Sequence, residues 1–99
     1  MASYLVNLDP VPSQEFTASV GTNSFVCRLK YAGIMLFSCS LNGEEICRDT
    51  PCPANRPVFA YQWQRQLAGG SFIFWTERGE WPHFENFNSS CSMTFEEDV

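Results

Sequence analysis

A chain of 99 residues with a net charge of −5 is long enough for one domain with a modest core, and we expect one domain over residues 1–99. Its six basic residues are scattered, whereas a protein that follows a phosphate backbone clusters them, so we expect no nucleic-acid partner. No stretch approaches the ~20 apolar residues that span a bilayer, and residues 1–11 lack the features of a signal peptide, so we expect no membrane anchor.

Alternation of apolar and polar residues predicts five short strands in the first half of the chain. They are predicted at residues 3–8, 16–20, 25–31, 35–41 and 44–48. Pro10 and Pro12 end the first strand, because proline cannot donate to a sheet. Asn42-Gly43 lies between the last two strands and predicts a tight hairpin, since both residues tolerate positive φ.

The second half begins with a proline-rich loop at residues 49–57. Residues 58–68 are predicted as a strand, because Phe59, Tyr61 and Trp63 alternate and no helical stripe is evident. Gly69-Gly70 predicts a hairpin-type turn. The remaining segments are a buried strand at 71–77, an irregular or edge segment at 81–87, a polar turn at 86–90, a last strand at 91–95 and a solvated acidic end at 96–98.

Short strands separated by turn signals every 8–12 residues or so indicate an all-β fold. We expect a small antiparallel sandwich or partly open barrel of about seven strands, with little or no helix. The apolar phases of these strands predict a buried core made of Phe25, Leu29, Phe37, Leu41, Phe72, Phe74 and Phe95.

The residues offer little for catalysis. His83 is the only histidine, and a catalytic triad would have to include it, but no serine lies in a nucleophile motif. Glu77, Glu80 and Glu85 surround the Trp81-Pro82 turn and resemble a glycosidase pair only weakly, since acidic residues on a solvated turn explain them more simply. We therefore expect no catalytic residues and no enzyme activity.

Five cysteines are an odd number, so at least one stays unpaired within a monomer. Cys27 and Cys39 fall on the apolar phase of their strands and are expected to be buried. Cys47 and Cys52 flank a turn, where they are candidates for a local or intersubunit disulfide or for reactive thiols. Their C-x₄-C spacing lacks a second ligand pair, so we expect no metal site and no cofactor.

Nine Phe, three Trp and three Tyr are more aromatic side chains than a small domain can hide, so some should form a subunit contact. The candidates in irregular or turn-adjacent segments are Trp63, Trp81, Phe84 and Phe87. The 49–57 loop is the second candidate, through Pro51, Pro53 and Arg56, because prolines pre-order a binding loop.

Five motifs follow one another in an order that resembles a known family. They are Pro12-Ser13-Gln14-Glu15-Phe16, Arg28-Leu29, Leu41-Asn42-Gly43-Glu44, Ser71-Phe72-Ile73-Phe74-Trp75, and Glu80-Trp81-Pro82 with Phe84-Glu85-Asn86-Phe87. Their order and spacing resemble the small baseplate plug or hub-associated tail proteins of contractile-tailed bacteriophages. The high cysteine content departs from that resemblance.

The resemblance implies a structural, non-enzymatic part of the virion tail baseplate, made in the host cytoplasm. It also implies contacts with phage tail hub, tube or baseplate proteins, in multiple copies within a symmetric assembly. The alternative is a small carbohydrate- or protein-binding β module, in which Trp63, Trp75 and Trp81 form a platform for sugar rings. A secreted disulfide domain is a third interpretation, which the absence of a signal peptide disfavours.

Overall fold

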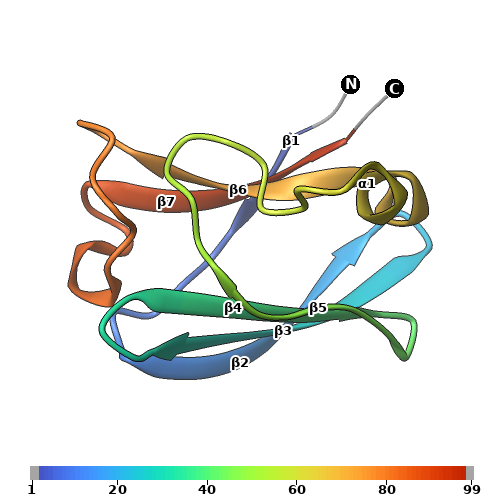
Figure 1. Cartoon of the computed structure of the whole chain (residues 1–99), viewed down its shortest axis with the longest axis horizontal. Helices are drawn as coiled ribbons and strands as arrows, with labels where there is room; N and C mark the ends of the chain where they lie inside the picture. Colours follow the sequence, from blue (N-terminus) through green and yellow to red (C-terminus); the bar gives the residue numbers. More distant parts are fainter. Residues whose placement is uncertain (1–2, 98–99) are drawn as a thin grey trace.

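Seven strands form two antiparallel sheets in the computed structural model, which describes residues 3–97. The strands are β1 (Ser3–Val6), β2 (Ser13–Val20), β3 (Asn23–Tyr31), β4 (Met35–Leu41), β5 (Glu44–Pro51), β6 (Gly70–Thr76) and β7 (Cys91–Glu97). One sheet has the order β2-β3-β4-β5 and the other β1-β7-β6. Figure 1 shows the two sheets as facing layers, so the predicted all-β fold is confirmed as an open sandwich.

The four-stranded sheet is a meander built from consecutive hairpins. Leu41 pairs with Glu44 across the turn between β4 and β5. The two residues between them, Asn42 and Gly43, have φ values of 50° and 89°. Positive φ at both central positions is the requirement of a type I′ turn, so the hairpin predicted from this dipeptide is confirmed.

The core lies between the two sheets and is dominated by phenylalanine. All seven predicted core residues are buried, at 5% exposure or less. The Phe72 ring on β6 lies at the centre of this packing. Its centroid is 5.0–6.0 Å from those of four other rings, namely Phe25, Phe37, Phe59 and Phe95. Most of these contacts are edge-to-face, the favourable arrangement for aromatic quadrupoles.

The prediction of a strand over residues 58–68 is wrong, because Gln62–Ala68 form the helix α1. Tyr61 is the N-cap residue of the helix, and its backbone N–H donates to the Gln64 side chain at 3.1 Å. Gln64 and Ala68 lie one turn apart and are its buried residues. The sequence shows no apolar stripe here because one of these two buried residues, Gln64, is polar. Its side-chain amide donates to the Ile46 carbonyl on β5.

The Gly69-Gly70 pair is likewise not a hairpin turn. Gly69 ends α1 in the left-handed conformation, with φ of 75°, and donates to the Arg65 carbonyl. Gly70 is already the first residue of β6 and pairs with Glu97. A Cβ atom on Gly70 would lie 2.2 Å from the Glu96 carbonyl oxygen, so the close approach of β7 requires glycine there.

The segment between β5 and α1 carries the chain from one sheet to the other (Figure 1). It begins later than predicted, because β5 continues to Pro51 instead of ending at Arg48. Its apolar residues Cys52, Val58 and Phe59 are buried, so it closes one side of the sandwich and is not a free loop.

The central position of Phe72 makes it the most sensitive site for stability. We expect Phe72→Ala to lower the free energy of unfolding by about 3–5 kcal/mol, because the truncation leaves a cavity among four rings. Urea unfolding followed by circular dichroism measures the change. Val26→Ala, at a site 44% exposed on the outer face of β3, is the control and should change stability by about 0.5 kcal/mol or less. Equal effects of the two substitutions would contradict this account of the core.

Candidate functional site

Four of the seven predicted interface residues line one groove on the surface. Pro51, Pro53 and Arg56 come from the end of β5 and the segment after it, and Trp81 comes from the β6–β7 connection. The groove has a volume of about 400 Å³. Arg65 of α1 also lines it, together with Thr50, Pro57, Val58, Phe59 and Ala60. The fold thus joins the two regions that the sequence suggested separately.

The groove rests on a segment that β6 holds by hydrogen bonds. The Asn55 backbone N–H donates to the Phe74 carbonyl at 2.7 Å, and the Val58 N–H donates to the Phe72 carbonyl at 2.9 Å. The Asn55 side-chain oxygen accepts from the Thr76 N–H at 2.8 Å. These bonds, with the restricted φ of three prolines, fix the floor before any partner arrives.

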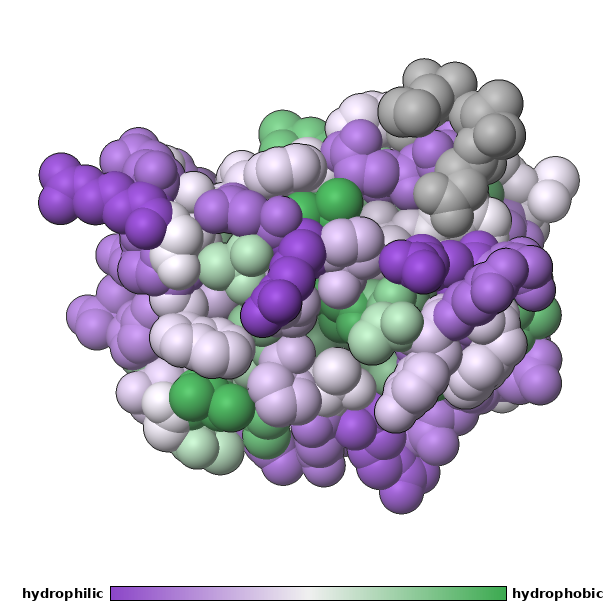
Figure 2. All heavy atoms as spheres, turned by 45° about the horizontal axis from the view of Figure 1, so that its top comes forward, coloured by the Kyte–Doolittle hydropathy of each residue, from purple (hydrophilic) through white to green (hydrophobic). Residues whose placement is uncertain are grey.

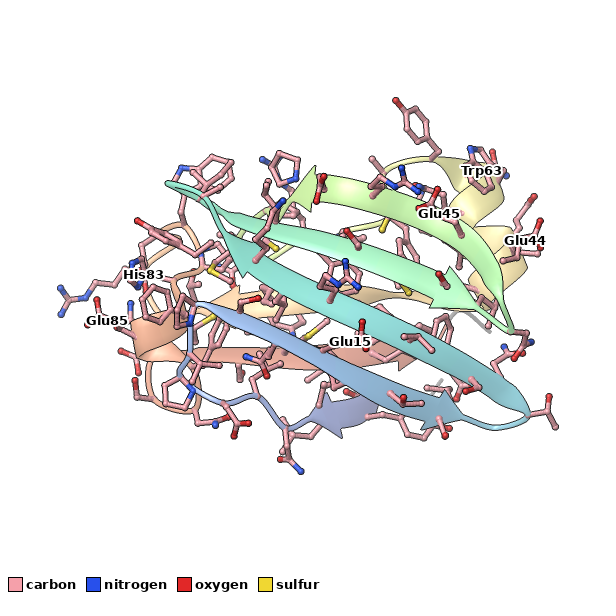
Figure 3. All side chains as sticks on the ribbon, turned by 90° about the horizontal axis from the view of Figure 1, so that it is seen from below. Glu15, Glu44, Glu45, Trp63, His83 and Glu85 are labelled. Carbon is pink, nitrogen blue, oxygen red and sulfur yellow. The ribbon has the colours of Figure 1, made fainter. Side chains whose placement is uncertain are left out.

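Among the residues that the structure describes, the basic side chains of the sheet face are ion-paired, whereas those of the groove are not. On the outward face of the four-stranded sheet, Arg28, Lys30 and Arg48 each pair with a carboxylate at 2.8–3.7 Å, on Glu15, Asp49 and Glu45 respectively. Figure 3 shows Glu15 and Glu45 on this face. Within residues 3–97, Arg56 and Arg65 have no ion-pair partner. The groove therefore combines an apolar lining with two uncompensated positive charges.

Trp63 does not line the groove. It lies on α1 with 54% of its surface exposed, close to two other exposed apolar residues of the same helix region, Tyr61 and Leu67. Figure 3 shows Trp63 at one end of the sandwich and His83 at the other. In Figure 2 the hydrophobic areas are small and separated by hydrophilic ones on the face shown. The exposed side chains of Tyr61, Trp63 and Leu67 make the α1 region a second, smaller apolar surface.

Two of the predicted interface residues are used inside the fold. Phe87 is 3% exposed and stacks on Phe74 with centroids 6.4 Å apart, so its side chain belongs to the core and is not available on this surface. Phe84 is half-buried and packs against Tyr31 and His83 at 5.3 and 4.6 Å. Phe87 thus has little surface left for a partner, because loop residues fill the end of a small sandwich, whereas the half-buried Phe84 stays an interface candidate.

His83 holds the segment that contains Phe84 in place through several contacts. Its Nδ1 accepts from the Glu85 backbone N–H at 3.2 Å, and the Glu85 carboxylate lies 3.8 Å from it. The imidazole also contacts the Tyr31 ring, with centroids 5.0 Å apart. These contacts cap the 3₁₀ helix η1 (Phe84–Asn86) and hold it against the end of β3. The structure therefore gives this histidine a structural role.

The acidic end is partly engaged within the chain. Hydrogen bonds from the Ser3 and Thr94 hydroxyls lower the pKa of the Glu96 carboxyl. The Tyr4 hydroxyl donates to Glu97 at 2.9 Å, and this bond raises the pKa of Tyr4. Glu96 and Glu97 thus belong to β7 and support its pairing with β1, whereas Asp98 lies outside the described residues.

A family profile described as "Cyanophage baseplate Pam3 plug gp18" matches residues 3–98. The chain belongs to this family. No curated protein matches the sequence. The resemblance drawn from the order of the five motifs is therefore confirmed at the level of a phage baseplate plug family.

Membership of a baseplate plug family gives the chain a structural role in the phage tail. Within residues 3–97, the structure has no helix with the length and apolar character needed to cross a membrane. Arg65 is the charged groove residue that sequence reasoning missed. Recognising α1 from its Tyr61–Gln64 capping pair and terminal glycine would have placed Arg65 beside the proline-rich segment.

The cysteines of this plug family member are buried free thiols, all five of them. Cys27 and Cys39 are buried as predicted, with their sulfur atoms 3.9 Å apart across β3 and β4. Cys47 and Cys52 are free thiols in the structure, and the intersubunit disulfide considered from the sequence stays a prediction. Burial raises the pKa of Cys47 to about 12 and that of Cys91 to about 11.

Thiol reactivity should follow exposure in the folded protein. Cys47 is 8% exposed on the edge strand β5, whereas the other four cysteines are at most 2% exposed. We expect iodoacetamide at pH 8 to modify Cys47 first and the others only after local opening. Mass spectrometry of partly alkylated native protein measures the order. Initial labelling of Cys52 would contradict the burial described here.

The raised thiol pKa values also predict a pH dependence. A thiol in the unfolded chain has a pKa of about 8.5, so it loses its proton near that pH. In the folded protein the pKa of Cys47 is about 12, so this thiol stays protonated to a higher pH. The stabilising effect of the neutral buried thiols is complete below the unfolded pKa and is lost as the pH rises through this window. Urea unfolding at pH 7 and pH 10 should therefore show lower stability at pH 10, and Cys47→Ala should reduce the difference.

Proposed function

We propose that this protein acts in the baseplate through protein–protein contacts, packed against hub, tube or other tail subunits in multiple copies. The observation that carries the proposal is the groove between Pro51, Arg56 and Trp81, which joins exposed apolar and cationic side chains on a fixed floor. Trp and Arg are the residue types that contribute most to binding at interfaces. Membership of a plug family supplies the setting for such contacts.

Preorganisation explains why such a groove suits an assembled particle. A flexible loop loses conformational entropy when it binds, and this loss weakens the contact. Here Asn55 and Val58 are already bonded to β6, and the prolines restrict the backbone further. The groove can therefore bind without first becoming ordered.

One groove is smaller than a complete interface. A standard interface covers about 800 Å² on each partner. We propose that the exposed aromatic side chains of the α1 region, Tyr61 and Trp63, supply further contact area. A subunit that is bound through both the groove and the α1 region would be held in one orientation.

Tail incorporation tests the proposal. In a phage that lacks the gene and is complemented from a plasmid, wild-type protein should copurify with tails in a fixed ratio. Trp81→Ala should lower that ratio by at least about tenfold, because truncating an interface tryptophan commonly costs more than about 1.4 kcal/mol.

Val26→Ala is the matched control, because it removes an exposed apolar side chain from the ion-paired sheet face. It should be incorporated like wild type. Wild-type protein that is missing from purified tails would refute the function itself. Equal incorporation of Trp81→Ala and wild type would refute the contact assigned to the groove.

A further inference from the structure

We infer that the groove receives an extended acidic segment of a neighbouring, different subunit. Carboxylates of this segment pair with Arg56 and Arg65, and an apolar residue packs between Trp81 and the prolines. The inference rests on the proposed function and adds to it the chemistry of the partner. Four observations carry it: charge, hydrogen-bond accounting, packing surface and the state of the chain's own acidic end.

The chain carries a net charge of −5. In such a chain nearby carboxylates are plentiful, and three of the six basic residues have one within 4 Å. Two of the other three, Arg56 and Arg65, line the same groove and have no such partner among residues 3–97. Guanidinium groups bind carboxylates through paired hydrogen bonds, so an acidic ligand complements this groove.

Hydrogen-bond accounting excludes recognition through added strand pairing. Pro51, Pro53 and Pro57 have no backbone N–H. The N–H groups of the buried residues Cys52, Val58 and Phe59 already donate within the chain, to the Met35 carbonyl, the Phe72 carbonyl and the Ser71 hydroxyl. A ligand therefore finds few backbone donors and must be recognised by side chains.

The packing surface indicates what accompanies the acidic groups. Trp81 is 60% exposed, and Pro51 and Ala60 beside it are also exposed. These apolar surfaces lie against the floor formed by Val58 and Phe59. An aliphatic or aromatic side chain that enters here removes apolar area from water on both partners. The ligand is thus acidic and apolar together, not simply anionic.

A second copy of this chain is a poor source of that segment. Its acidic end at Glu96 and Glu97 is already bonded to Ser3, Tyr4 and Thr94. Docking it in a neighbouring groove would break these bonds and weaken the pairing of β1 with β7. Two copies, each of charge −5, also repel one another. These costs favour a different subunit.

Photo-crosslinking in assembled tails identifies the ligand directly. A benzoyl-phenylalanine placed at Ala60, which is exposed in the groove, should crosslink to a peptide of another baseplate protein with two or more Asp or Glu residues. The same group at Val26, on the ion-paired face, should not give this product. A crosslinked peptide that is basic, uncharged or from a second copy of this chain would overturn the inference.

Charge reversal tests the role of the arginines. Arg56→Glu and Arg65→Glu should each lower incorporation into tails by at least about tenfold, because each places a carboxylate against a carboxylate. Arg78→Glu is the matched control: Arg78 is exposed, lacks an ion-pair partner among the described residues and lies outside the groove. It should change incorporation by less than about twofold.

The experiments distinguish failure of the acidic-partner inference from failure of the proposed baseplate function. If wild-type protein is in tails but Arg56→Glu and Arg78→Glu behave alike, the acidic partner is wrong and the baseplate function stands. If Arg56→Glu is poorly incorporated, lysine in place of the crosslinked carboxylates of the partner should restore it. Failure of this charge swap, with the folded state of both variants verified by circular dichroism, would also overturn the inference.

Discussion

The packing of Phe72 against the other core rings is the interaction on which the rest of the structure depends. It joins the two sheets through β6, which pairs with β7 at one edge and bridges to the groove segment at the other. Carbonyl groups of Phe72 and Phe74 accept the hydrogen bonds that hold Val58 and Asn55. The same strand thus supplies both the centre of the core and the support of the candidate site.

The regular part of this fold could be predicted from the sequence because one face of each sheet is buried. A slip of one residue would expose Phe25 and Leu29 together, so the alternation determines the register as well as the strands. The helix could not be predicted from periodicity, because Gln64 is buried through a hydrogen bond to Ile46 and not through apolar contact. Polar burial of this kind leaves no hydrophobic pattern.

The candidate site was predictable only in pieces. Pro51, Arg56 and Trp81 could be named as interface candidates because a proline-rich loop and exposed aromatics carry a local signal, and the structure places all three in one groove. Their meeting in one groove depends on tertiary pairing, such as that of Pro57 with Ile73. Burial of Phe87 against Phe74 is also tertiary, so sequence reasoning placed it on the surface. In both cases the sequence shows the chemical character of the residues but not which distant segments come into contact.

The exposed side chains of the groove are distinct from the residues that hold the sandwich together. The groove side chains Arg56, Arg65 and Trp81 contribute charge and exposed area and are not core residues, whereas the floor residues Val58 and Phe59 belong to the core. The proposed partner contacts would be made by side chains, with little backbone pairing. Binding or loss of a partner there would leave the Phe72 cluster unchanged. A subunit held by an added strand would instead have to lose a row of backbone hydrogen bonds at once.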